Sequence, residues 1–383
     1  MKMQVLFPLL LLLLNVNCRL ANRSNMPVEQ KQVQPKDSAS YNESVAAKDV
    51  AVTAGDTSSS LATRFGVMVA KSGGRNIPPE RQAQIVKALG VNYTRAKIDI
   101  KTWNGSSNAC DAYTAAGLKF LLNVNYAVPR NAVGDHNPVP FPTDMAAYSN
   151  ALNSILDKYK PEVLVVENEE DNPLYHTGSA EDYLTELKTA IDIAHKRGIK
   201  VTNGGITVRE VCLIVYDDLM QKGRKKEAMD FVTKAAPPAL VQRVQNTNNK
   251  MIQRQIEFGR KILAAYKTLD LDYVNFHWYE PVKMRGKGGD ADFDAAIFSY
   301  VADYIKTATG KPVMSNEFGV LQPSPELVKN ILHAVRNAGL AYGIFYSADG
   351  GTEGSGKAVA LQDAGGNLKE NGVAFRDFIK QAH

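Results

Sequence analysis

The sequence predicts a single (β/α)₈ barrel over residues 64–383, and three observations lead to this fold class. Eight short apolar runs that look like buried strands alternate with segments whose apolar residues recur at helical spacing. Several helical segments end in a glycine followed by an apolar residue, as a helix C-cap does before a strand. An open doubly wound sheet is the structural alternative, but no Gly-x-Gly-x-x-Gly phosphate loop follows the first strand.

The expected strands are rich in β-branched and aromatic residues and follow one another at the spacing of a barrel. They are Phe65–Ala70, Tyr93–Ile98, Lys119–Asn125, Val163–Asn168, Lys200–Gly204, Tyr273–Tyr279, Pro312–Asn316 and Ala341–Tyr346.

The helices between these strands are predicted from their start and stop signals. A cap residue or a proline opens each periodic segment, as in Pro78–Glu80, Thr143–Asp144, Ser179–Glu181 and Ser324–Glu326. Glycine closes several of them, at Gly90, Gly117, Gly198 and Gly339.

The segment Thr207–Asp272, between the fifth and sixth expected strands, is too long for one helix. We interpret it as an extended helical insertion of two or three helices, with a loop around Pro237–Pro238, near the barrel mouth.

The first residues are expected to direct export. Lys2 precedes an apolar run from Val5 to Leu14, which is shorter than the roughly 20 residues that span a bilayer. Cys18 stands where a lipoprotein signal places its lipid-bearing cysteine, although Asn15 and Asn17 are unusual before it. Residues 1–18 are therefore predicted to be a signal peptide. Lipid anchoring at Cys18, ordinary secretion and a different topology remain the alternatives.

Residues 19–63 are predicted to form a flexible tether. They are Ser, Asn, Lys, Gln, Asp and Ala with scattered Val, and they contain too few large apolar residues to bury a core. A tether of this kind would hold the barrel away from the cell envelope.

Composition excludes a dedicated nucleic-acid binder. The 383-residue chain has a formal net charge of +5 and a pI near 8.8, and its basic run Lys222–Lys226 lacks interleaved aromatics. We expect this run to be a solvated helix end. Cys110 and Cys212 have no metal-binding spacing and are interpreted as buried free thiols, with a disulfide as the alternative in an exported protein.

Polar and charged residues gather where the expected strands end. The fourth strand runs into Val165–Asn172, which reads V-V-E-N-E-E-D-N, and the seventh runs into Glu317. The sixth carries His277 and Tyr279 at alternate positions, and the second carries Arg95. Because the carboxyl ends of barrel strands open on one face, these groups are predicted to form a site there.

This set resembles clan A, the retaining glycoside hydrolases on (β/α)₈ barrels, which include many β-glycanases and β-glycosidases. The resemblance covers most of the chain from about Arg64 to Ile379. It depends on Asn168-Glu169 after the fourth strand, Glu317 after the seventh, and His277-x-Tyr279 on the sixth. The ending Ala360–Leu368, after an aromatic eighth strand, also looks like the clan's.

The resemblance implies a role for each of these residues. Glu169 would be the acid/base and Glu317 the nucleophile, roughly 5–5.5 Å apart. Asn168 would bind the sugar 2-OH, His277 would line the sugar pocket, and Arg95 and Tyr279 would keep Glu317 ionised.

Several assignments stay open at this point. Alternation places Glu167 and Glu169 on one face and Asn168 on the other only if the strand stays regular. Because this strand ends irregularly in clan members, the resemblance favours Glu169 as the acid/base, with Glu167 and Glu170 as the competing choices. Tyr346 stands where clan members most often carry a tryptophan, and Asn123–Tyr126, with Asn125 as the candidate sugar ligand, stands where many carry a histidine. The remaining candidate sugar platforms are Trp278, Trp103 and Tyr126.

The predicted function is retaining hydrolysis of β-glycosidic bonds in an oligo- or polysaccharide, with no metal and no cofactor. A barrel that binds carbohydrate without cleaving it is the second hypothesis. A metal-dependent hydrolase is the third and is disfavoured, because the chain has only six histidines and only His277 falls at an expected strand end. Contact with a membrane is expected only through a lipid at Cys18.

Overall fold

The computed structural model describes residues 62–69, 77–127, 137–246, 249–280, 294–348, 360–363 and 365–382. The predicted signal peptide and all but the last two residues of the predicted tether lie outside these ranges. Among the described residues, no helix is both long and apolar enough to cross a bilayer.

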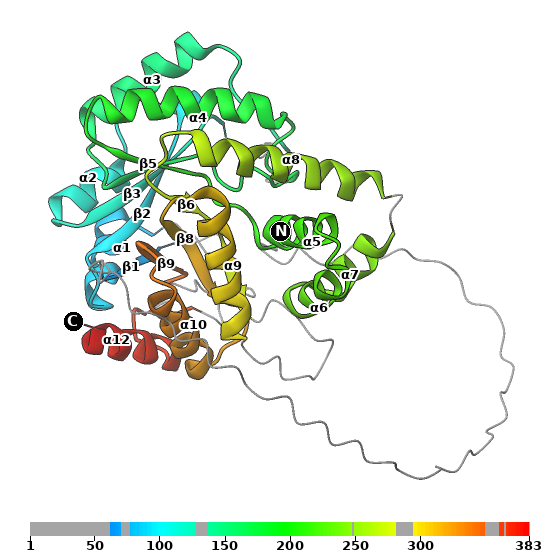
Figure 1. Cartoon of the computed structure of the whole chain (residues 1–383). Coiled ribbons are helices and arrows are strands. Elements are labelled where there is room, and N and C mark those ends of the chain that lie inside the picture. The colour runs from blue at the N-terminus through cyan, green and yellow to red at the C-terminus, as the bar shows by residue number, and fades with distance from the viewer. Residues whose placement is uncertain are drawn as a thin grey trace, which may run out of the picture. The chain divides into compact units, whose positions relative to one another are not determined.

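Parallel strands form a nearly closed barrel, as the sequence predicts (Figure 1). Their hydrogen-bonded order is β5-β4-β3-β2-β1-β9-β8-β6, and β7 also pairs with β8. β6 and β7 together make the sixth barrel strand, and parallel bridges at Thr202–Tyr273 and Ile206–Phe276 link it to β5 and the residues after it. The strands are β1 (Arg64–Met68), β2 (Tyr93–Asp99), β3 (Lys119–Asn125), β4 (Val163–Val166), β5 (Lys200–Asn203), β6 (Val274–Asn275), β7 (Trp278–Glu280), β8 (Val313–Val320) and β9 (Tyr342–Tyr346).

Helices connect successive strands, and most begin at the predicted caps. Ser179 accepts from the backbone N–H of Asp182, and the Asp182 side chain accepts in return, which makes a capping box. The helix-ending glycines Gly90, Gly117, Gly198 and Gly339 all have positive φ, as a C-cap requires. The helices outside the long insertion are α1 (Pro79–Ala88), η2 (Ile100–Thr102), α2 (Asn108–Ala115), α3 (Met145–Lys158), α4 (Ala180–His195), α9 (Ala295–Thr309), α10 (Pro325–Asn337) and α12 (Glu370–Ala382).

The segment between β5 and β6 differs from the expected two or three helices. Its described residues form four, namely α5 (Val208–Gln221), α6 (Lys225–Ala235), α7 (Pro238–Gln245) and α8 (Lys250–Thr268). Gly223, at φ 75°, ends α5 and lets the chain turn back into α6. Pro237 is a helix cap and not a free loop, because α7 starts immediately after it.

Two apolar clusters hold the barrel together. The larger lies between the strands and the surrounding helices, and the smaller fills the barrel interior. The interior cluster consists of Leu121, Val163, Val165, Tyr273, Met314, Tyr342 and Ile344. Further along the same strands, inward positions change to Asn123, Asn275 and Asn316, all fully buried. The barrel interior is therefore apolar toward the amino ends of the strands and polar toward their carboxyl ends.

Cys110 and Cys212 are both buried and free, as predicted. Burial raises the pKa of the Cys110 thiol to about 11, so this thiol is protonated at neutral pH.

Candidate active site

The structure brings most of the predicted site residues together at the carboxyl ends of the strands. Side-chain contacts link residues from four parts of the barrel, so segments far apart in the sequence converge on one place. These residues are Arg95 from β2, Asn168 and Glu169 after β4, His277 and Tyr279 from the sixth barrel strand, and Glu317 from β8.

Glu317 is held by two donors. Arg95 Nη1 lies 2.5 Å from its Oε2, and Tyr279 Oη lies 2.5 Å from its Oε1. Burial raises the pKa of Glu317, but the charges of His277 and Arg95, with the hydrogen bonds from Tyr279 and Arg95, lower it below its ordinary value of 4.5. Glu317 is therefore an ionised carboxylate at neutral pH.

An irregularity in β8 turns Glu317 toward the site. The pairing of β8 with β9 loses its register between Ser315 and Phe318. Asn316 contacts residues of the barrel interior, and strict alternation would send the next side chain outward. The extra residue at this break allows Asn316 and Glu317 both to face inward.

Glu169 faces His277. Its Oε1 lies 3.1 Å from His277 Nδ1, and its Oε2 accepts from Asn172 Nδ2 at 2.6 Å. The backbone of Glu169 has φ 49°, in the left-handed region that residues other than glycine seldom adopt. Glu167 has φ 67° for the same reason: the chain leaves β4 in a tight, irregular turn.

This turn sends the four acids after β4 to different hydrogen-bond partners. Glu167 accepts from the backbone N–H of Tyr126 at 2.6 Å. Glu170 accepts from Asn203 Nδ2 at 2.8 Å and from Tyr266 Oη at 2.6 Å. Asp171 accepts from the backbone N–H of Thr207 at 2.9 Å, next to the start of α5. Only Glu169 of the four contacts His277 in the described structure.

The two candidate catalytic carboxylates are close together. Nearest ligand atoms of Glu169, Glu317 and His277 all lie within 4.8 Å of one another. A cation could use such a spacing, but the guanidinium of Arg95 already lies against Glu317 and supplies positive charge there. We therefore interpret these groups as an acid–base site.

Asn168 is oriented by two contacts. Arg95 Nη2 donates to its side-chain oxygen at 2.5 Å, and His176 Nε2 lies 3.0 Å from its backbone oxygen. Burial lowers the pKa of His176 to about 4, so its ring is neutral and donates this hydrogen bond through Nε2–H. With Oδ1 taken by Arg95, Asn168 can offer its Nδ2 hydrogens to a ligand.

Sequence reasoning missed the residues behind this arrangement, and most of them are asparagines. Asn123 accepts from Arg95 and donates to the backbone oxygen of Glu167. Asn203, Asn275 and Asn316 are linked to one another and to His277. A signal was present, since Asn275, His277 and Tyr279 follow with a period of two and share one strand face.

Gly205 permits the close approach of His277. A Cβ atom at this position would lie 2.2 Å from His277 Nε2, and its φ of 113° is a conformation that L side chains rarely adopt. The backbone after β5 therefore forms a wall against the imidazole ring, and only glycine fits there.

Two candidate sugar platforms pack against the helix layer, and for the fully buried Trp278 the prediction is wrong. Trp278 is fully buried on the opposite strand face from His277 and packs edge-on against Phe298 of α9, at 6.1 Å between ring centroids. Trp103 packs edge-on against Tyr159, which follows α3, and donates to Ser154. The packing of each tryptophan follows from its position in the chain. Alternation along the strand turns Trp278 outward, and Trp103 lies after β2 against the helix layer.

The other candidates lie at strand ends. Tyr346 packs edge-on against Tyr279 at 6.1 Å, and the Tyr346–Ser347 peptide bond that follows it is cis. Asn125 is buried and accepts from Asn123 Nδ2 at 3.1 Å. Tyr126 is half-buried, with the ammonium of Lys101 4.6 Å from its ring centroid.

Five further acids, Glu167, Glu170, Asp171, Glu186 and Glu210, are buried in the barrel. Burial raises the pKa of Glu167 to about 7, and burial with the charge of Glu170 raises the pKa of Asp171 to about 8. Burial also raises the pKa of Glu170, Glu186 and Glu210 above the ordinary value of 4.5. The folded protein therefore holds protons on carboxyl groups that would be ionised in the unfolded chain.

We expect the free energy of unfolding to fall as pH rises from 6.5 to 8. A carboxyl whose pKa is higher in the folded protein than in the unfolded chain holds its proton more tightly when folded. Its contribution to the free energy of unfolding is complete below the unfolded-state pKa and is lost as the pH rises through the folded-state pKa. The loss is roughly 1 kcal/mol per pH unit for each group. His277 acts in the same direction, because its pKa is also raised. The acids named above supply the effect in this range. Urea unfolding at several pH values measures it.

Glu186→Gln provides the matched test of this prediction, since it removes one titrating group of α4. Its stability should depend less steeply on pH than that of the wild type. Glu326→Gln, at an exposed position of α10, should leave the slope unchanged. A wild-type stability that rises between pH 6.5 and 8 would contradict the burial of these acids as neutral groups.

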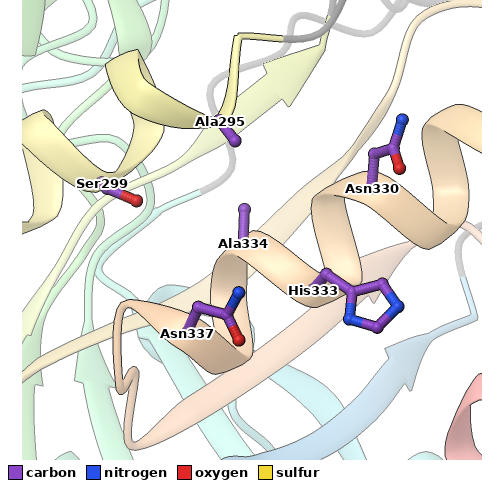
Figure 2. Close-up of a pocket in the computed structure, with 6 residues that line it drawn as sticks. All are labelled: Ala295, Ser299, Asn330, His333, Ala334 and Asn337. Carbon is purple, nitrogen blue, oxygen red and sulfur yellow. The ribbon is translucent and has the colours of Figure 1, made fainter.

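A cavity of about 360 Å³ lies away from the site, between α9 and α10 in the outer helix layer (Figure 2). Its lining is Ala295, Ser299, Asn330, His333, Ala334 and Asn337. His333 Nδ1 accepts from Arg336 at 2.9 Å, so it is already engaged. None of the strand-end residues lines this cavity.

Comparison of the sequence with protein-family models finds no match, and neither does a search of curated proteins. Comparison of the fold with solved structures does find similar barrels. The exo-β-1,4-mannosidase Op5Man5 from Opitutaceae bacterium strain TAV5 is 15% identical, with a TM-score of 0.52 over 84% of this chain and 59% of that one. The chain thus corresponds to 59% of the mannosidase's length.

A second structure, XacCel5A, is 10% identical, with a TM-score of 0.52 over 84% of this chain and 99% of that one. The chain shares the (β/α)₈ barrel fold of these proteins. A GH5-4 broad-specificity endoglucanase from Clostridium longisporum is also similar, at 13% identity and a TM-score of 0.49 over 81% of this chain and 88% of that one. At such identities the likeness concerns the fold, and the site must be argued from its own geometry.

Proposed function

We propose that this chain is a retaining β-glycoside hydrolase, with Glu317 as nucleophile and Glu169 as acid/base. The observation that carries the proposal is the spacing of the two carboxylates, whose nearest oxygens lie within 4.8 Å. Retaining enzymes place their carboxyl groups roughly 5–5.5 Å apart, whereas inverting enzymes need roughly 6.5–9.5 Å to admit a water.

The two environments suit the two roles. A nucleophile must be ionised, and Arg95 and Tyr279 stabilise the charge of Glu317 through hydrogen bonds of 2.5 Å each. An acid/base must exchange a proton, and Glu169 has a titratable partner, His277, at 3.1 Å. Asn168, which Arg95 and His176 orient, would bind a sugar hydroxyl next to Glu169.

The reaction then runs in two steps. Glu317 attacks the anomeric carbon while Glu169 protonates the leaving oxygen, giving a glycosyl ester on Glu317. Glu169 next takes a proton from water, which attacks the same carbon and releases Glu317. Two inversions leave the sugar with its original configuration.

The substrate class is a β-linked glycan. One protein of similar fold, at a TM-score of 0.52, is an exo-β-1,4-mannosidase by its description, which supports a β-linked substrate. Export remains part of the proposal, with residues 1–18 as its signal and Cys18 as a lipid attachment point.

Product stereochemistry tests this proposal directly. Proton NMR of the first product formed from aryl β-glycosides should show the β-anomer before mutarotation. An initial α-anomer would exclude Glu317 as a nucleophile. Binding of β-glycans without release of reducing ends would favour the non-catalytic carbohydrate-binding barrel instead.

A further inference from the structure

A chain of buried amides behind His277 fixes where hydrogens lie. The backbone N–H of Asn316 can only donate, and it lies 2.9 Å from Asn275 Oδ1. The other end of the Asn275 amide is therefore Nδ2, which lies 2.8 Å from Asn316 Oδ1. This orients the Asn316 side chain with its oxygen toward the barrel interior.

The Asn275 amide has a second contact that agrees with this orientation, since its Nδ2 also lies 3.3 Å from the backbone oxygen of Asn203, which can only accept. The side chain of Asn203 is oriented in turn by the backbone of Asn275. Its Oδ1 accepts from the backbone N–H of Asn275 at 2.7 Å, and its Nδ2 donates to the backbone oxygen of Asn275 at 2.9 Å. Both asparagines are fully buried. The amides therefore have one consistent arrangement.

The oriented amide of Asn316 determines the protonation of His277. Asn316 Oδ1 lies 2.8 Å from His277 Nε2, and an amide oxygen cannot donate. Nε2 must therefore carry a hydrogen. Gly205 leaves no space for the ring to move away from this contact, since a Cβ there would lie 2.2 Å from Nε2.

The opposite ring nitrogen faces the acid/base. His277 Nδ1 lies 3.1 Å from Glu169 Oε1, and a hydrogen bond between them needs one proton. If His277 is neutral with hydrogen on Nε2, that proton belongs to Glu169. If His277 is an imidazolium, Glu169 is ionised and the proton lies on Nδ1.

We propose that Asn316 is a positioning residue that keeps a hydrogen on Nε2 of His277, so that His277 and Glu169 hold one shared proton between Nδ1 and Oε1. This inference rests on the proposed function, in which that proton passes to the leaving oxygen as the glycosidic bond breaks. After the first step, the ionised Glu169 faces the lone pair of His277 Nδ1. This arrangement favours transfer of a proton from water to Glu169. The pair thus loses one proton in the first step and regains one in the second.

The alternative tautomer would stop the acid step. A neutral His277 with hydrogen on Nδ1 would donate to an ionised Glu169, and no proton would remain for the leaving group. Asn316 excludes this tautomer because it offers Nε2 only an acceptor.

The charged groups around His277 favour retention of the proton that His277 shares with Glu169. Glu169 after β4 and Glu317 on β8 raise the pKa of His277, whereas burial and Arg95 on β2 lower it, and the net shift is upward. Burial raises the pKa of Glu170, and the charge of His277 lowers it, so the two groups interact electrostatically without a direct contact in the described structure. Tyr279, on the same strand as His277, is neutral, because burial raises its pKa.

Asn316→Asp tests the proposal and keeps the shape of the side chain. Within the described chain, Asn316 Nδ2 donates to no acceptor, so the exchange removes no described hydrogen bond. The introduced carboxylate faces Nε2–H and favours the imidazolium. We expect the alkaline limb of the pH profile of kcat/KM to move upward by about 1 unit or more.

Asn316→Leu should have the opposite effect, because it removes the acceptor and admits the inactive tautomer. Hydrolysis of glycosides with poor leaving groups, which need the acid, should fall at least about 10-fold more than hydrolysis of dinitrophenyl glycosides. General structural damage would reduce both alike. Asn153→Asp on α3 serves as control and should leave the profile unmoved.

Imidazole ¹⁵N NMR reports which ring nitrogen of His277 carries a hydrogen, and this measurement does not require the protein to be catalytically active. In the wild type, Nε2 of His277 should be protonated from pH 6 to 8, and Asn316→Leu should change its signal. If the wild type hydrolyses no β-glycoside, the proposed function fails while this spectrum still reports the proton. A wild-type His277 with hydrogen on Nδ1 alone, or an unmoved limb in Asn316→Asp, would overturn the role of Asn316.

Discussion

Glu317→Ala is expected to abolish turnover on every β-glycoside. No other described carboxylate is held by both Arg95 and Tyr279, so no other group can replace it in forming the glycosyl ester. Loss of a nucleophile of this kind costs about 10⁵–10⁶-fold in kcat. Initial rates on aryl glycosides and on soluble β-glycans measure the loss.

Azide gives this variant a distinguishing product. With the Glu317 side chain shortened, azide can enter from its side and displace an activated leaving group, giving the inverted α-glycosyl azide. Glu326→Ala, at an exposed position of α10, is the control and should keep wild-type rates. A Glu317→Ala protein that still hydrolyses β-glycosides would rule out this residue as nucleophile.

Glu169→Ala is expected to respond differently. A dinitrophenol leaves without protonation, so the glycosyl ester still forms, while its hydrolysis slows because no base activates water. Substrates with poor leaving groups should lose about 10²–10⁴-fold in kcat/KM. Pre-steady-state kinetics should then show a burst of dinitrophenol followed by a slow phase.

Azide should rescue this second variant and give the β-glycosyl azide, since it attacks the ester from the side of the missing carboxyl. Glu170→Gln is the matched control, because its neighbouring carboxyl contacts Asn203 and Tyr266 instead of the site. If Glu169→Ala gives the α-azide, or if Glu170→Gln shows the same kinetics as Glu169→Ala, the acid/base has been misassigned.

The barrel could be predicted because its signals are local. The strand at Val163–Val166 is a run of β-branched and leucine residues, and α4 carries its own cap at Ser179. Helix-ending glycines follow from backbone sterics alone. The basic run Lys222–Lys226 was expected to be a helix end, and α5 does end at Gln221. The number of helices in the insertion could not be read from the sequence, because short amphipathic segments lack distinct boundaries.

The site could be predicted in part. His277 and Tyr279 lie two positions apart on a regular strand, so their side chains lie on the same face and could be predicted together. Glu169 and Glu317 depend on irregular backbone, at φ 49° and at the register break of β8, which no alternation rule describes. Trp278 was misassigned for the complementary reason, since its strand stays regular and turns it toward α9. The asparagines were missed because their role lies in contacts between strands.

The buried acids change the electrical properties of the folded barrel. The formal net charge of +5 counts every Asp and Glu as ionised. Burial raises the pKa values of Glu186 and Glu210 well above 4.5, and each proton that the folded protein keeps on such a group adds one positive unit to that count. The native protein therefore migrates as a more basic molecule than its composition implies. Its field attracts anionic polymers and surfaces more strongly than the sequence total suggests, and ionic strength screens that attraction.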